Sequence, residues 1–182
     1  MPPVSFLIAS TVVALTALTV TGCATMSEQD CRHAHWESVG LQDGLEGASA
    51  KRLDGHREAC ASTGVVPDTV QWRRGYAHGL RSYCTPNSAW NVGLANQTYH
   101  GVCGHLDEPT FLRYHRAGVL VWQARQELSR SRAVLTRLET DLNKAATEGE
   151  RRRLNDEIAR TERELSRLTI LVAALQSAAP SR

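Results

Sequence analysis

Hydrophobic and polar positions divide the chain into three stretches with different periods. Residues 4–20 are almost continuously apolar and carry no charged side chain. Residues 31–105 mix short apolar stretches with glycines, whereas from residue 117 onward leucines recur every seven residues among charged side chains. A short apolar N-terminal run is typical of a secretory segment, and a seven-residue leucine period is typical of a coiled coil. The pattern therefore predicts a targeting segment, a compact module and a helical tail.

The glycine-rich stretch predicts three helices, over residues 31–47, 50–63 and 69–83. The third has the clearest helical period, because its aromatic residues and glycines recur at spacings of three and four. Asp68 is expected to cap this helix. Residues 89–105 contain three glycines and are expected to form a largely irregular loop.

A weak internal repeat links the first and third of these helices. Each has a tryptophan followed by two glycines four residues apart, and glycine costs about 1 kcal/mol relative to alanine inside a helix. The repeat is explained either by duplicated binding elements or, as we favour, by helices that cross at bare glycine faces. The residues concerned are Trp36, Gly40 and Gly44 in the first helix and Trp72, Gly75 and Gly79 in the third.

The leucine rows of the tail predict an antiparallel hairpin over residues 117–178. The row through Leu128 and Leu135 is out of phase with the row through Leu168 and Leu175. One straight seam cannot join them, so residues 145–150 are the expected corner between two helices of ~40 Å or more. Twelve basic and nine acidic side chains interleave from residue 117 onward, as on a solvated coiled-coil surface. Packing within one chain and self-association of the hairpin both fit this pattern.

The apolar N-terminal run ends in Val20-Thr21-Gly22-Cys23, an aliphatic residue and two small residues before a cysteine. This resembles the lipobox of bacterial lipoproteins. The resemblance implies a signal peptide over residues 1–22, lipidation of the Cys23 thiol with palmitate-type chains, and a polar tether over residues 23–30. Ala24 after the cysteine implies, by analogy, the outer membrane facing the periplasm. The alternative is an uncleaved signal anchor, since residues 1–3 contain no Lys or Arg.

Cysteine number and net charge add two constraints. The formal net charge of +2 is too small to indicate a nucleic-acid partner. In an oxidising compartment, the four cysteines beyond Cys23 predict two disulfides. If the first two helices form an antiparallel hairpin, Cys31 lies beside Cys60. Cys84 and Cys103 would then close the loop between them.

One stretch of the chain contains, in this order, Cys31, Trp36, Gly40, Asp43, Gly44, Gly47, His56, Arg57, Cys60, Pro67, Asp68, Gly75, Gly79, Leu80, Tyr83, Cys84, Thr85, Pro86, Gly93, Tyr99, Val102 and Cys103. This order, over about residues 31–116, resembles a family of small bacterial envelope lipoproteins. The family is catalogued as domain of unknown function 2799. The resemblance implies a place in the envelope and supplies no activity.

Three polar residues of the module are candidates for a site. We expect Asp43 to form a structural hydrogen-bonded pair with His56 and Arg57, between the first two helices, in preference to a catalytic role. A glycine and aromatic cleft around Trp36, Trp72 and Tyr76 would offer a face to a ligand or partner. The residues Cys31, His33, His35, Asp43, His56 and Cys60 could instead surround a metal ion.

Motif spacing argues against chemistry at these positions. The chain has no Cys-x-x-Cys, His-Glu-x-x-His or Gly-x-Ser-x-Gly motif. The sequence therefore predicts no metal, no cofactor and no catalytic residue. We expect a mainly α protein, with a disulfide-stapled, Gly-rich helical module over residues 31–116 followed by a long antiparallel coiled-coil hairpin over 117–178.

Two functional classes follow from this organisation. The first is a lipid-anchored structural or adaptor protein that contacts the membrane through its lipid and binds other envelope components. The second is a periplasmic module that binds a small ligand or metal, as a binding protein or as an enzyme. A saturable change in tryptophan fluorescence with a small molecule would favour the second class.

Overall fold

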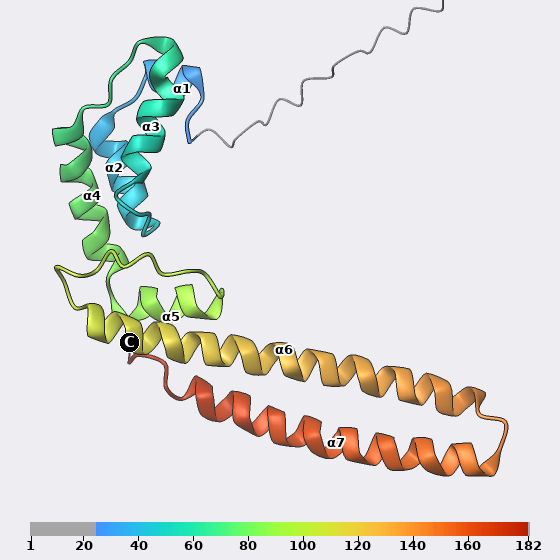
Figure 1. Ribbon diagram of the computed structural model, residues 1–182. Coiled ribbons are helices and arrows are strands. Elements are labelled where there is room, and N and C mark those ends of the chain that lie inside the picture. Colours follow the sequence, from blue (N-terminus) through green and yellow to red (C-terminus); the bar gives the residue numbers. More distant parts are fainter. Residues whose placement is uncertain (1–24, 182) are drawn as a thin grey trace, which may run out of the picture.

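The computed structural model of the chain describes residues 25–181. Over this range the chain forms α-helices and one short 3-10 helix, with no β-strand, so the predicted mainly α class is confirmed. A helical module stands at one end of a long helical hairpin (Figure 1). Cys23 and the lipobox lie outside the described residues. The helices are α1 (Glu28–Arg32), α2 (Trp36–Leu45), α3 (Arg52–Cys60), the 3-10 helix η1 (Ala61–Thr63), α4 (Thr69–Tyr83), α5 (Pro86–Leu94), α6 (Glu108–Lys144) and α7 (Glu148–Gln176).

Helices α2 and α4 pack against each other more extensively than any other pair. The contact is made by glycines on both helices. A Cβ atom on Gly75 would overlap the Glu37 carbonyl oxygen and lie 2.7 Å from the Leu41 nitrogen. The repeated tryptophan-glycine pattern thus corresponds to two helices whose backbones touch, as the favoured explanation of the repeat expected.

The first predicted helix is divided in the structure. It was expected to run over residues 31–47, but α1 ends at Arg32 and α2 begins at Trp36. Cys31 and Trp36 both lie in one buried cluster. Five residues apart on a continuous helix, they would point about 140° away from each other. The break between the two helices allows both side chains to reach the same core.

The predicted tether is partly folded onto the module. Helix α1 begins at Glu28, inside the segment expected to be a polar tether. The Ser27 hydroxyl accepts a hydrogen bond from the Asp30 backbone N–H, and the Asp30 carboxylate accepts one from the Ser27 N–H. The Ser27 hydroxyl also donates to the Asp30 carboxylate, and this bond, together with the one from the Ser27 N–H, holds the pKa of the Asp30 carboxyl below its ordinary value. Met26 packs against the buried cluster around Trp72.

A second helix crossing joins the module to the hairpin. The expectation of an irregular loop over residues 89–105 is wrong in its first part, because α5 runs from Pro86 to Leu94. The Thr85 hydroxyl accepts a hydrogen bond from the Ser88 N–H, and Pro86 occupies the first turn, where its missing N–H is harmless. Gly93 of α5 then packs directly against Gly118 of α6.

Helices α6 and α7 form the predicted antiparallel hairpin (Figure 1). The corner comprises residues 145–147, at the start of the expected range, and the Thr147 hydroxyl caps α7 by accepting from the Glu150 N–H. At 1.5 Å per residue the two helices are roughly 55 and 43 Å long. Helix α6 crosses the predicted domain boundary between residues 116 and 117, so module and hairpin share one continuous helix.

The four cysteines are paired as the sequence analysis favoured. Cys31 is joined to Cys60, with a Cα–Cα distance of 5.5 Å, and Cys84 is joined to Cys103, with a Cα–Cα distance of 5.6 Å. The first disulfide links α1 to the end of α3. The second fixes the segment after α5 beside the end of α4.

Candidate functional site

The Asp43 carboxylate is the centre of a buried hydrogen-bonded network. Asp43 lies on α2 and is 5% exposed, while its partner His56 lies on α3 and is 3% exposed. The Asp43 Oδ2 atom is 2.8 Å from His56 Nε2 and 2.8 Å from Trp72 Nε1. Since an indole N–H can only donate, Trp72 donates to the carboxylate. One carboxylate therefore connects the three helices α2, α3 and α4.

The other ring nitrogen of His56 holds the N-terminal segment. His56 Nδ1 is 2.9 Å from the Thr25 hydroxyl oxygen. If His56 Nε2–H donates to Asp43, a neutral ring leaves Nδ1 as an acceptor for the Thr25 hydroxyl. The imidazole is thus part of a hydrogen-bonded chain from the start of the described residues to the module core.

The arginine that contacts the Asp43 carboxylate is Arg52, whereas the sequence analysis expected Arg57. Arg52 Nε donates to Asp43 Oδ1 at 3.4 Å, and its Nη2 lies 3.6 Å from Glu46. Arg57 instead pairs with Asp54 and donates to the Thr69 hydroxyl. The predicted Asp43–His56 pair is present, but Arg57 is not part of it. Arg52 precedes His56 by four residues, one helical turn, so both reach the same carboxylate.

The predicted aromatic cleft is filled in the structure. Trp36 and Trp72 are 7% and 2% exposed, so neither indole offers a face to a ligand. Trp72 stacks on Tyr76 with 4.6 Å between ring centroids, and the Tyr76 hydroxyl donates to the Ala48 carbonyl. Burial, with a smaller contribution from the Asp43 charge, raises the pKa of Tyr76. These aromatic residues support the fold around Asp43.

A cavity of about 630 Å3 opens beside the Asp43 network. Its wall includes Asp43, His56 and Thr25 themselves. The segment between α1 and α2, which the sequence analysis placed inside a helix, supplies further polar groups. Sequence reasoning missed this cavity because it depends on the break between the two helices. The wall is completed by Met26, Gln29, Asp30, His33, Ala34, His35, Ser38, Val39, Gln42, Glu46 and Arg52.

Within the described residues, the histidines and cysteines that are close in the sequence do not form a metal-binding geometry. Among residues 25–181, no group of three or more His, Cys, Asp or Glu side chains is placed to hold a metal ion. Cys31 and Cys60, two of the considered ligands, are bonded to each other.

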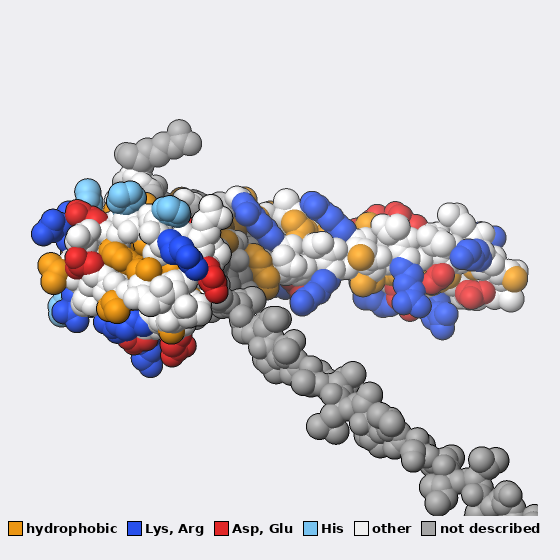
Figure 2. Space-filling model, turned by 90° about the horizontal axis from the view of Figure 1, so that it is seen from above, with side chains coloured by type: hydrophobic (Ala, Val, Ile, Leu, Met, Phe, Trp, Pro, Cys, Tyr) orange, Lys and Arg blue, Asp and Glu red, His pale blue; other side chains and the backbone are white. Residues whose placement is uncertain are grey.

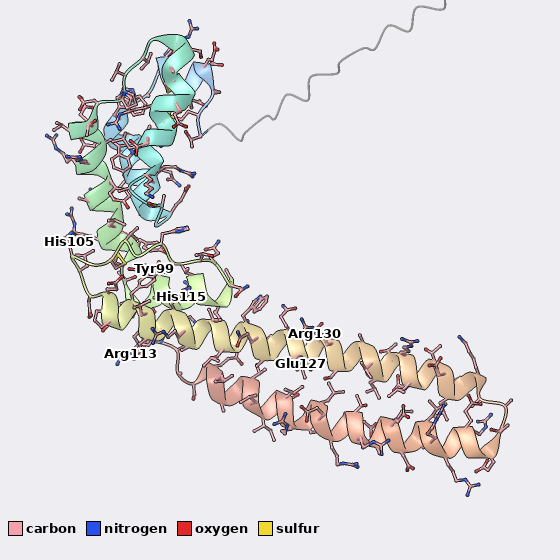
Figure 3. The ribbon with its side chains drawn as sticks, in the orientation of Figure 1. Tyr99, His105, Arg113, His115, Glu127 and Arg130 are labelled. Atoms are coloured by element: carbon pink, nitrogen blue, oxygen red, sulfur yellow. A yellow bond between two sulfur atoms is a disulfide. The ribbon has the colours of Figure 1, made fainter. Side chains whose placement is uncertain are left out.

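A second aromatic cluster surrounds Tyr99 at the junction of module and hairpin. The Tyr99 ring packs 4.6 Å from Phe111, and its hydroxyl donates to Glu108 and accepts from the Cys103 N–H. Tyr99 and His115 lie side by side above α6 (Figure 3). Burial, together with the hydrogen bond to Glu108, raises the pKa of Tyr99 to about 12. These contacts fix the loop that follows α5.

Comparisons with known proteins support the resemblance described above. Residues 35–120 match the family model described as a protein of unknown function (DUF2799). The chain is also similar to the uncharacterised protein YfiL of Escherichia coli K12, with 25% identity over 117 residues, which cover 60% of this chain and 83% of YfiL. No solved structure is detectably similar to the chain. Neither the description of the family nor the name of YfiL states an activity.

No helix within the described residues is both long and apolar enough to span a membrane.

Proposed function

We propose that this chain, whose residues 35–120 belong to the DUF2799 family, is a lipid-anchored envelope protein of adaptor type. In this proposal Cys23 carries the lipid and the α6–α7 hairpin binds another envelope component. The observation that carries the proposal is a long helical hairpin whose apolar side is only partly covered. The helical module would then hold the hairpin near the membrane.

Two features of the module support an extracytoplasmic, anchored position. Both cysteine pairs are joined as disulfides, which persist mainly in oxidising compartments. Thr25, two residues after the proposed attachment site, is already bound to His56. A lipid on Cys23 would therefore hold the module close to the membrane surface, with little free chain between them.

Lipidation of Cys23 is tested by labelling cells with radioactive palmitate. The wild-type chain should incorporate the label, and Cys23→Ser should lose it entirely, because serine offers no thiol for alkylation. Cys103→Ser is the matched control, since it removes a cysteine from a disulfide and should retain the label. Labelling of Cys23→Ser at the wild-type level would refute the lipid anchor.

A groove follows one side of the hairpin between α6 and α7. Two adjoining hollows, of about 480 and 310 Å3, share Glu127 and Arg130 in their walls. Figure 3 shows these two side chains on the part of α6 that runs beside α7. The groove floor includes Leu168, which is buried. A continuous groove of this kind fits one further helix.

The groove has the composition of a helix-binding surface. Leu120, Val134 and Leu171 line it and are 50%, 49% and 39% exposed. Glu127 and Arg130 lie 3.4 Å apart on its edge, so both charge signs are available to a partner. Figure 2 shows apolar patches between the charged side chains along the hairpin. We take the occupant to be an amphipathic helix of another envelope protein, with mixed charges beside its apolar stripe.

Photo-crosslinking from single positions of α7 tests this groove in intact cells. A crosslinking residue at position 171 should trap a partner, and the crosslinked peptide should come from an amphipathic helix. Position 170 is the matched control: Ile170 is also apolar and is 72% exposed, but it is not among the groove residues. Leu120→Glu should abolish the adduct, because it places a charge in the groove.

Two results would contradict the adaptor assignment. Equal trapping from positions 170 and 171 would show that the contact does not depend on the groove. Crosslinks exclusively to a second copy of the chain would show that the hairpin serves self-association instead.

A further inference from the structure

The wall of the cavity beside Asp43 carries many polar groups. Its volume of about 630 Å3 lies within the range of about 300–1,000 Å3 that small-molecule sites occupy. Met26, Ala34 and Val39 are the apolar residues among the fourteen of this wall, and each of the other eleven carries a polar group on its side chain. An apolar ligand such as an acyl chain would leave many polar groups without partners, which is costly.

Charge further restricts the ligand. The carboxylates of Asp30, Asp43 and Glu46 face one guanidinium, that of Arg52, so an anion would meet net repulsion. A cation would have to compete with the chain itself for these carboxylates, because all three already accept hydrogen bonds or ion pairs within the module. Asp30 accepts from Ser27, Asp43 from Trp72, and Glu46 from Gln42, whose amide donates at 2.8 Å.

The remaining groups suit a neutral ligand with several hydroxyls. His33, His35 and Ser38 present exposed side chains on the wall, and each can both donate and accept a hydrogen bond. Arg52 Nε donates to Asp43, and Arg52 Nη2 pairs with Glu46. The Arg52 side chain is 43% exposed. The remaining N–H groups of its planar guanidinium can therefore donate to hydroxyl oxygens of a ligand. The buried Asp43 network holds this guanidinium in place.

We infer that the cavity between α1, α2 and α3 is a binding site for a neutral saccharide. The site is separate from the hairpin groove and does not depend on the adaptor function. Hydroxyl groups would exchange hydrogen bonds with the imidazoles, the Ser38 hydroxyl and the Gln42 amide. The sugar would contact the module at the end where Thr25 and Met26 enter it.

The inference is tested by isothermal titration calorimetry on the full chain in a polyoxyethylene detergent, which contains no sugar. The neutral probes are triacetylchitotriose and maltotriose; inorganic phosphate, butylamine and hexanoate represent anionic, cationic and partly apolar ligands. At least one trisaccharide should bind saturably, and the other three probes should not. Binding of phosphate or butylamine in place of the sugars, or no binding of either trisaccharide at millimolar concentration, would overturn the inference.

Matched double variants locate the site. His33→Ala with Gln42→Ala removes two exposed groups of the cavity wall and should weaken sugar binding about tenfold, the effect of losing two neutral hydrogen bonds. His78→Ala with Gln71→Ala removes the same residue types from the exposed face of α4 and should leave binding unchanged. Equal affinities of the two double variants would place the sugar elsewhere and overturn the assignment.

Discussion

Replacing Gly75 by alanine should lower the free energy of unfolding by about 3 kcal/mol or more. The added methyl group would overlap the Glu37 carbonyl oxygen and lie within 2.7 Å of the Leu41 nitrogen. Both contacts are with backbone atoms, so no side chain can turn aside to make room. The two helices would have to separate along the whole crossing, which is the costly end of overpacking. Chemical denaturation followed by far-UV circular dichroism measures the change.

Gly149→Ala is the matched control for this experiment. A Cβ atom on Gly149, in the first turn of α7, meets no other group within 4 Å. Alanine has the higher helix propensity, so this variant should keep or gain stability, by less than about 1 kcal/mol. A Gly75→Ala protein as stable as Gly149→Ala would show that α2 and α4 are not in backbone contact.

The α2–α4 crossing explains why large aromatic residues flank it. Helices that meet at glycines approach closely, and the side chains next to the contact then enclose its edges. Trp36 and Trp72 do this from the two helices, and both are buried in the same cluster. The glycine spacing therefore determines where Asp43 and Trp72 meet. The buried hydrogen-bonded network around Asp43 thus depends on the backbone contact between α2 and α4.

Elements set by local signals could be predicted from the sequence. Helix α4 begins and ends where expected, because the Asp68 carboxylate caps its first turn and the aromatic-glycine period ends at Tyr83. The corner of the hairpin was placed by the phase change of the leucine rows. Disulfide pairing also followed, since the order of the helices brings Cys31 beside Cys60.

Features that depend on tertiary contacts could not be predicted. The break before Trp36 exists because Cys31 and Trp36 share one core, which a helical period does not reveal. The burial of Trp72 follows from the depth of the glycine crossing, whereas the sequence shows only that the residue lies on a helix face. For α5 a local signal was present, because Thr85-Pro86 is a good helix start. The expectation of a loop over residues 89–105 overlooked this signal.

Replacing Asp43 by alanine should cost about 3 to 5 kcal/mol of the free energy of unfolding. The carboxylate is the common acceptor of Trp72 Nε1–H, His56 and Arg52, and both Trp72 and His56 are buried. Without it, these two buried groups lose their common partner. Removing one member of a buried charged network typically has an effect of about this size.

Two further variants separate the network from other causes of instability at Asp43. Asp43→Asn has nearly the same volume, so it leaves no cavity, but only one oxygen can accept. Its NH2 group must therefore face either the Arg52 Nε–H or the shared position of His56 and Trp72. It should therefore remain clearly less stable than wild type. Asp54→Ala removes a carboxylate that is 64% exposed and paired with Arg57, a change worth less than about 1 kcal/mol. If Asp43→Asn and Asp54→Ala had equal, small effects, the carboxylate would not organise the module, and Arg52 would have no fixed position beside the cavity.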